Sequence, residues 1–130
     1  MKRMVVVRII LVALAVVMVG AGGVALAHTY AWTDSQANHE WDDCLNWNFI
    51  GGGAGCRYPS TTHDDAIIPS TGGPWTVELV TDAIDDLTIS DDTDFDSSTG
   101  SPVTLTVDTL TIAAQVTVTF TSNAKIVSAS

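Results

Sequence analysis

The sequence is poor in cations and in catalytic signatures, and each shortage excludes a class of function. It has five lysine and arginine residues against fifteen aspartate and glutamate residues, a formal net charge of −10. Because nucleic acids bind proteins mainly through anionic phosphates, this balance excludes nucleic-acid binding. The G-x-S-x-G, H-E-x-x-H and glycine-rich phosphate-loop motifs are also missing, so we expect no catalytic residue.

Cysteine is nearly absent, since Cys44 and Cys56 are the only two. A structural zinc site requires about four ligands, and no C-x-x-C or paired-histidine spacing supplies them. In an exported chain, the default for two such cysteines is a disulfide that closes the loop between them.

The one long hydrophobic segment lies at the N-terminus. Residues 1–27 have a basic start, an apolar run from Ile9 to Val19 and small residues up to Ala27, which is the layout of a secretory signal. Arg8 interrupts the apolar stretch and leaves it short for a membrane span of about 20 residues. We expect cleavage after Ala27 and a secreted or cell-surface protein, with an uncleaved N-terminal anchor as the alternative.

Removal of this segment would make the protein more acidic. Three of the five cations lie in residues 1–27 and all fifteen acids follow, so residues 28–130 have a formal net charge of −13. Only Arg57 and Lys125 remain as strong cations, which argues against a lyase acting on acidic sugars. The acidity favours solubility, as in a saline habitat, over binding of calcium or another cation.

The remaining sequence divides into two parts of different composition. Residues 28–75 contain all four tryptophans, both tyrosines and a glycine-rich run, whereas residues 76–130 alternate Val, Ile and Thr with a period of two. Such alternation is typical of short strands with one buried face. We expect an irregular, disulfide-bonded cap in the first part and strands in the second.

The second part also repeats itself. The segment VTDAIDDLTIS at 80–90 aligns with VTLTVDTLTIA at 103–113, with six of eleven positions identical at an offset of 23 residues. The same offset relates Gly100 to Asn123, two residue types that tolerate a left-handed turn. A period of this length, made of short strands and turns, is typical of a solenoid. Stacked coils would align four sets of core residues: Val80–Val103–Ile126, Ile84–Val107, Leu87–Leu110 and Ile89–Ile112.

The repeat breaks off early in its third copy. That copy would begin at Ile126, four residues before Ser130. Solenoids generally need three or more repeats and polar caps at their ends. We therefore expect an open β edge that is covered by the remainder of a longer β-helix or by another chain.

Taken in order, EWDDCLNW, YPSTTHDDAIIP, TVEL and LTI resemble the N-terminal region of large secreted bacterial and archaeal surface proteins built on right-handed parallel β-helices. The matching elements are Asn46–Trp47, the segment from Pro59 to Pro69 and the Leu87–Ile89 step, and the resemblance covers nearly all of residues 30–113. It implies an all-β fold that begins a right-handed parallel β-helix. The Cys44–Cys56 pair and the early end of the repeat depart from the family pattern.

The segment HDDAIIP at 63–69 joins the two parts of the expected fold. His63, Asp64 and Asp65 could form a metal or acid–base cluster, but adjacent residues of an extended chain point to opposite faces. We favour a turn before a strand at Ile67–Ile68, which Pro69 ends.

The alternating aspartates at 92–96 are the best candidates for cation binding. Asp92, Asp94 and Asp96 have the spacing of calcium loops, but Ser97 and Val103 stand where an EF-hand has glycine and glutamate. A solvated acidic turn is favoured over a weak calcium site, and no other cofactor is expected.

The tryptophans present a similar choice between structure and binding. They either pack as the cap of a Val, Ile and Leu core or form a platform on which sugars stack, and we favour the cap. The candidate platform consists of Trp32, Trp41, Trp47 and Trp75. We therefore expect an exported structural or adhesive cell-surface module; the alternative is a carbohydrate-binding or polysaccharide-active front end that meets an extracellular polysaccharide.

Overall fold

The computed structural model describes residues 27–52, 55–97, 99–121 and 123–129, so the expected signal peptide lies, apart from Ala27, outside the described residues. The described part contains β-strands and one short 3₁₀ helix, η1 (Cys44–Asn46), and no α-helix. The described part of the chain is therefore all-β, as the alternating sequence predicts. No helix in these described ranges has the length and hydropathy of a membrane span.

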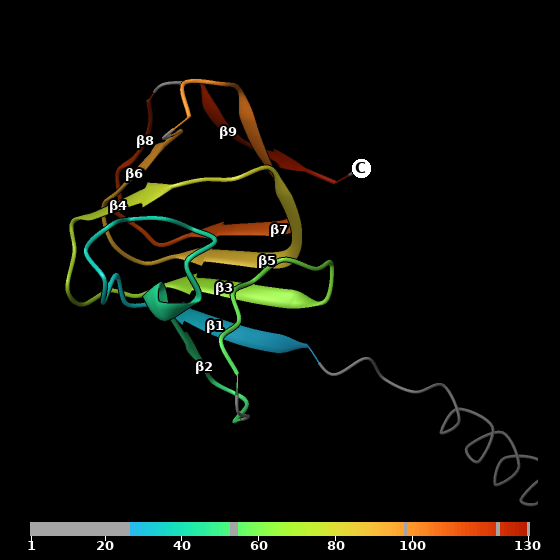
Figure 1. The fold of residues 1–130 in the computed structure, drawn as a ribbon. Coiled ribbons are helices and arrows are strands. Elements are labelled where there is room, and N and C mark those ends of the chain that lie inside the picture. The colour runs from blue at the N-terminus through green and yellow to red at the C-terminus, as the bar shows by residue number, and fades with distance from the viewer. Residues whose placement is uncertain (1–26, 53–54, 98, 122, 130) are drawn as a thin grey trace, which may run out of the picture.

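The strands form two sheets whose members alternate along the chain after β3 (Figure 1). All described strand pairs are parallel except the β1–β2 pair. From β3 onwards, each strand that is parallel to its neighbour therefore pairs with an earlier strand of the same sheet, except β4, which begins the second sheet. The six-stranded sheet has the order β2 (Trp47–Phe49), β1 (His28–Trp32), β3 (Asp64–Ile68), β5 (Asp82–Ile89), β7 (Val103–Ile112) and β9 (Ala124–Ser128). The three-stranded sheet has the order β4 (Trp75–Glu78), β6 (Thr93–Asp96) and β8 (Val118–Phe120).

Strands β5 and β7 pair at the 23-residue offset of the sequence repeat. Ile84 pairs with Val107, and the pairing continues to Ile89 with Ile112. In parallel strands, side-chain direction repeats every two residues, so this register places equivalent side chains over one another.

The turns that follow β6 and β8 also correspond. Gly100 and Asn123 both have positive φ values, 65° and 69°, as their residue types allow. The Asn123 side-chain amide donates a hydrogen bond to the Gly100 carbonyl oxygen at 3.3 Å. The two turns are therefore stacked, as their common offset in the sequence suggests.

The register of β9 differs from the expected one by two residues. Val103 pairs with Ala124 and Leu105 with Ile126, so the expected alignment of Val103 with Ile126 is wrong. The connection from β7 to β9 is shorter than the repeat predicts. Because a shift of two residues preserves the face of every side chain, Ile126 still packs against the core.

Both sheets enclose a single hydrophobic core. The six-stranded sheet contributes Ile68, Leu87 and Leu105, and the three-stranded sheet contributes Val77 and Phe95, all fully buried. Burying a side chain of this size stabilises a fold by about 1.5–3 kcal/mol. The same core contains the aromatic residues of the first part of the sequence, so residues 28–75 and 76–130 fold around common contacts.

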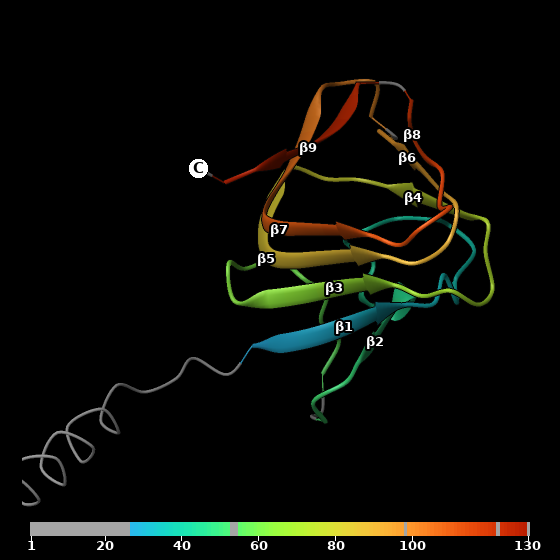
Figure 2. The same cartoon turned by 180° about the vertical axis from the view of Figure 1, so that it is seen from behind.

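The two ends of the six-stranded sheet are covered differently (Figure 2). At one end β2 pairs with β1, whereas at the other β9 pairs only with Val103–Val107 of β7. Leu110 and Ile112 lie beyond that contact and are 41% and 46% exposed. Their expected burial in the core is therefore wrong, although both keep the predicted register with β5.

Two leucines of β7 provide a direct test of this burial pattern. Leu105→Ala is expected to lower the free energy of unfolding by about 2–5 kcal/mol, because it empties a fully buried site. Leu110→Ala removes the same atoms from a solvent-exposed position and is expected to cost about 1 kcal/mol or less. Chemical denaturation of both variants measures the two values. Equal losses would contradict the placement of the core.

Candidate functional site

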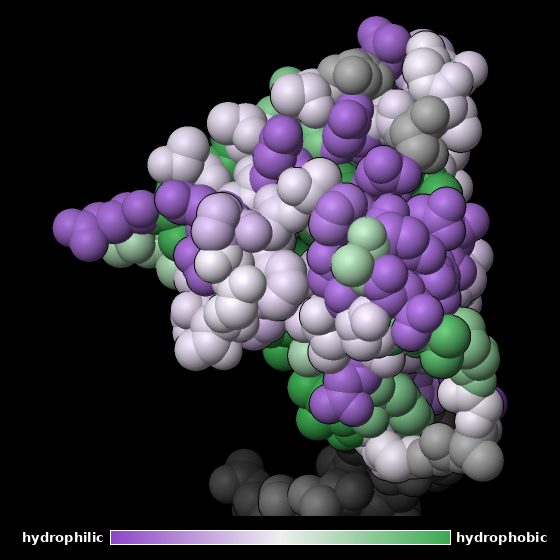
Figure 3. All heavy atoms as spheres, turned by 60° about the vertical axis from the view of Figure 1, so that its left-hand side comes forward, coloured by the Kyte–Doolittle hydropathy of each residue, from purple (hydrophilic) through white to green (hydrophobic). Residues whose placement is uncertain are grey.

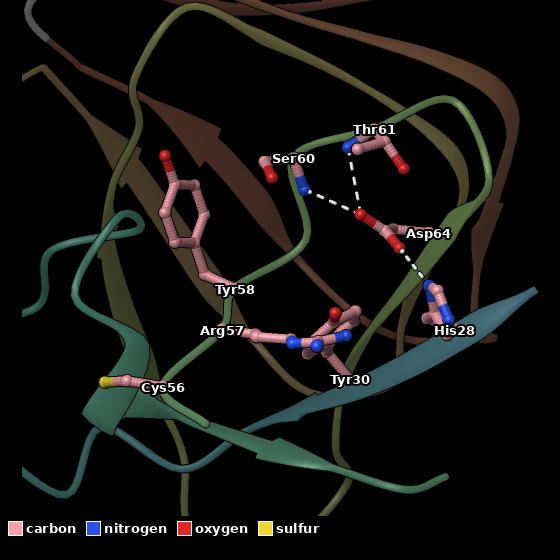
Figure 4. A pocket seen from close by; sticks show the side chains of 8 residues that line it. All are labelled: His28, Tyr30, Cys56, Arg57, Tyr58, Ser60, Thr61 and Asp64. Carbon is pink, nitrogen blue, oxygen red and sulfur yellow. Dashed lines mark hydrogen bonds and ion pairs between the residues drawn. The ribbon is translucent and has the colours of Figure 1, made fainter. Parts of the chain in front are cut away.

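A pocket of about 330 Å³ opens where β1, the segment after Cys56 and the turn before β3 meet (Figure 4). Its volume lies at the lower end of the range for ligand sites, about 300–1,000 Å³. The walls combine one guanidinium, one imidazole, two phenols, two hydroxyls and one carboxylate. The lining residues are His28, Tyr30, Cys56, Arg57, Tyr58, Ser60, Thr61 and Asp64.

A disulfide fixes one side of this pocket. Cys44 and Cys56 are bonded, with Cα atoms 5.2 Å apart, which confirms the expected bridge. The bond ties the segment containing Arg57 to η1, which is followed directly by β2. Such a bridge is typical of an oxidising, extracellular-type environment, and a loop of this size stabilises a fold by roughly 2–4 kcal/mol.

Asp64 forms the most buried polar part of the pocket. Its side chain accepts backbone hydrogen bonds at one oxygen, Oδ2, from Ser60 N at 3.1 Å and Thr61 N at 2.9 Å. The other oxygen, Oδ1, lies 3.1 Å from His28 Nδ1. Both carboxylate oxygens are therefore engaged within the protein, and Asp64 itself is only 3% exposed.

These contacts also show where the segment HDDAIIP turns and where its strand begins. Asp64 closes the turn before β3, His63 is exposed, and the strand ends at Ile68, directly before Pro69. Asp65 lies on the opposite face of β3 from Asp64, as neighbouring strand residues must. A turn precedes β3, but the strand begins at Asp64 and not at Ile67 as expected, and the three polar side chains do not share one site.

Tyr30 and Arg57 contribute hydrogen-bond donors to the lining of the pocket. Tyr30 is 2% exposed, and within the described part of the chain its hydroxyl makes no hydrogen bond. Burial raises the pKa of Tyr30; the nearby charge of Asp64 raises it further and that of Arg57 lowers it. Arg57 is exposed and has no ion pair among the described residues.

The sequence indicates only part of this pocket. Arg57 is one of two strong cations after residue 27, and it directly follows Cys56. The sequence therefore indicates that Arg57 lies beside the disulfide. His28 and Tyr30 carry no such signal, because they reach the pocket only through the parallel pairing of β1 with β3.

The tryptophans of the expected cap pack against one another. Trp32, Trp41 and Trp47 are 1%, 0% and 7% exposed, and their rings meet edge to face at centroid distances of 4.9 and 4.7 Å. Trp41 Nε1 donates to the Pro59 carbonyl oxygen, and Trp47 Nε1 donates to that of Trp41. These three rings have no open face for a sugar, which favours the interpretation as a cap over that of a platform.

The fourth tryptophan lies elsewhere, in a shallow groove of about 310 Å³ over β4, β6 and β8. The groove brings Trp75 together with Asp92 and Asp94 and four threonines and a proline: Thr76, Thr93, Thr117, Thr119 and Pro74. Thr117 N donates to Asp92 at 2.7 Å, and the Thr119 hydroxyl donates to Asp94 at 2.9 Å.

The proposed calcium ligands are not gathered into one cluster. Asp92 and Asp94 line the groove, whereas Asp96 accepts a hydrogen bond from Ser97 N at 2.6 Å. Over the described residues, no group of three or more His, Cys, Asp or Glu side chains is arranged to hold a metal ion.

On the side of the molecule drawn in Figure 3, hydrophilic residues form a broad area and hydrophobic residues occupy smaller areas. On β3 and β5, acidic residues come close to one another. Burial raises the pKa of Asp65, and the charges of Asp86 and Asp85 raise it further. Burial also raises the pKa of Asp82.

No protein-family model, curated protein or solved structure matches this chain. Its function must therefore be inferred from its own fold and side chains.

The raised pKa of Asp65 predicts a pH-dependent effect on stability. A carboxyl whose pKa in the folded state lies above its ordinary value of 3.8 destabilises the fold while it is ionised. Asp65→Asn is therefore expected to stabilise the protein near pH 7 by about 0.2–1 kcal/mol, as removal of a like-charge contact between strands does. As the pH falls towards about 4, the native wild type binds the proton first and the difference shrinks.

Thermal unfolding of both proteins at several pH values measures this difference. Asp108→Asn, at an exposed position of β7, is the control and is expected to change the midpoint less. A midpoint for Asp65→Asn at or below that of the wild type near pH 7 would rule out the proposed repulsion.

Proposed function

We propose that this protein is an exported structural or adhesive cell-surface module, built as the capped start of a right-handed parallel β-helix. The supporting observation is that the chain alternates between two sheets and pairs in parallel with its earlier passages, at β3–β5–β7 and at β4–β6–β8. Stacked passages of this kind bury equivalent side chains over one another, as the coils of a β-helix do. The resemblance of the sequence to β-helical surface proteins agrees with the proposal.

The closed end supports the role of a cap. Strand β2 covers the edge of β1, and Glu40 pairs with Glu78 alongside β4. The packed tryptophans and the Cys44–Cys56 bridge hold these irregular segments against the core. With only three residues, the end strand β2 offers little edge for further pairing, so growth of the fold is directed to the opposite end.

The open end supports a role in assembly. Large apolar side chains remain exposed there on β7, β8 and β9: Leu110, Ile112, Phe120 and Val127. An exposed β edge with apolar residues is a template for further strands. Its partner in this proposal is a further coil, supplied by the remainder of a longer β-helix or by another chain.

Export is part of the proposal. The layout of residues 1–27 is that of a secretory signal, and the disulfide agrees with an oxidising compartment. High acidity suits a protein that remains soluble outside the cell.

The open end predicts association that depends on its apolar residues. Protein purified from expression of the full 130-residue chain is expected to associate as its concentration rises in sedimentation velocity experiments. Threonine is β-branched and suits strands, but it removes apolar surface when it replaces Leu110 and Ile112, so this double variant is expected to remain monomeric.

A matched control replaces Leu45 and Ile50 with threonine, since these residues are 56% and 55% exposed but lie in the cap. It is expected to associate like the wild type. A wild-type protein that stays monomeric at every concentration, or equal behaviour of the two double variants, would refute assembly through the open end.

Carbohydrate binding is the second candidate function, and one observation favours it. The groove over β4, β6 and β8 places Trp75 beside two carboxylates and several hydroxyls, which together suit the apolar faces and hydroxyl groups of a neutral saccharide. Saturable binding of a neutral oligosaccharide in calorimetric titration, lost on Trp75→Ala and kept on Asp108→Asn, is the expected result for this function. Binding that is unchanged by Trp75→Ala would exclude the groove.

A further inference from the structure

We propose that the pocket beside the disulfide binds the carboxylate of a small hydroxylated acid, about the size of one sugar-acid unit, with Arg57 as its charged anchor. This ligand site goes beyond the proposed structural role and does not depend on it. The pocket is lined by residues of β1 and of the turn before β3, at the closed end of the molecule, whereas assembly is proposed for the opposite end.

The charges within the pocket favour one anionic group. Asp64 is the only lining carboxylate, and it is already satisfied by two backbone N–H groups and by the His28 imidazole. Arg57 has no ion-pair partner in the described part of the chain, so its charge remains available. An arginine fork matches a carboxylate with two parallel hydrogen bonds, the geometry in which such pairs are strongest.

The Tyr30 hydroxyl is the second observation that points to a ligand. Tyr30 as a residue is only 2% exposed, but its hydroxyl is not one of the buried atoms without a partner, so it is accessible at the pocket. This hydroxyl makes no hydrogen bond to the described residues, and it shares the pocket lining with Asp64 and Arg57. Both Asp64 oxygens already accept hydrogen bonds within the protein, so they leave the Tyr30 and Arg57 donors available. These two donors suit a ligand group rich in acceptor oxygens, such as a carboxylate.

The surroundings limit the ligand to a small acid with one negative charge. The pocket volume of about 330 Å³ lies at the lower end of the range for ligand sites, about 300–1,000 Å³, so it suits only a small ligand. Asp82 and Asp42 act on Tyr58, at one wall, and would repel a second anionic group there. Beyond about 8 Å the remaining acidity of the chain is largely screened at physiological ionic strength, so the lining groups decide binding.

The remaining walls suit a hydroxylated ligand. Ser60 and Thr61 offer hydroxyl groups that both donate and accept hydrogen bonds. Tyr58 is half-buried and presents an aromatic ring with a polar tip, which suits the mixed apolar and polar surface of a sugar-like acid. These groups favour a polyhydroxy acid over a simple inorganic anion.

Calorimetric titration of protein purified from expression of the full 130-residue chain tests the proposal. The probes are D-glucuronate, its neutral counterpart D-glucose, and sulfate as an inorganic anion. Saturable binding of glucuronate is expected, at least tenfold tighter than that of either of the other two. Arg57→Gln is expected to weaken glucuronate binding at least tenfold.

Lys125→Gln is the matched control, because it removes the other strong cation and lies in β9, outside the pocket. It is expected to change affinity by less than about twofold, a margin well below that of a charge-assisted hydrogen bond. Tyr30→Phe removes only the hydroxyl and is expected to weaken binding several-fold, which keeps the proposal testable if the Arg57 variant folds poorly.

Three results would overturn the proposal. The first is that glucuronate shows no saturable binding, and the second is that glucose or sulfate binds as tightly as glucuronate. The third is that Arg57→Gln and Lys125→Gln lose equal affinity for glucuronate. The last would mean that only the overall charge matters. None of these results bears on association through the open end, so the two proposals fail independently.

Discussion

Parallel pairing of β5 with β7 keeps each side chain of one strand over an equivalent side chain of the next, and most other features of the molecule follow from this register. It decides that Ile84 and Val107 face the core together. Strands β3 and β9 extend the same pairing on either side, and the three-stranded sheet closes the core from the other side. Without this register, the apolar positions of successive passages would not meet.

Stacking of this kind leaves two ends, and the sequence treats them in opposite ways. One end contains the bulkiest residues, an antiparallel strand and a disulfide. Trp41 is fully buried there, and its Nε1 donates a hydrogen bond to the Pro59 carbonyl oxygen. The other end keeps Leu110 and Ile112 exposed. A fold with one closed and one open end has a direction of growth, which is the physical basis of the proposed role as the start of a surface structure.

The sequence predicted the features that depend on local pattern. The 23-residue offset between the two repeats predicted the β5–β7 register, and two cysteines in a chain expected to be exported predicted the disulfide. The polar residues before Ile67 predicted a turn, but β3 already begins at Asp64. The sequence did not give the register of Ile126, because that depends on the length of one connection and a two-residue shift keeps the same face buried.

Features that depend on contacts distant in sequence were also missed. The segment HTYAW was expected to be part of an irregular cap, yet it forms β1, because its pairing with β3 joins residues 36 positions apart. The pocket of His28, Tyr30 and Arg57 arises from that pairing, and no local pattern encodes it.

Nuclear Overhauser contacts between backbone protons of β5 and β7 are the most direct test of the central claim. The account predicts contacts of parallel strands that connect the neighbourhood of Ile84 with Val107 and that of Ile89 with Ile112, in one continuous register. Close Hα–Hα contacts between these segments, which are typical of antiparallel neighbours, would contradict it, as would a register other than 23 residues.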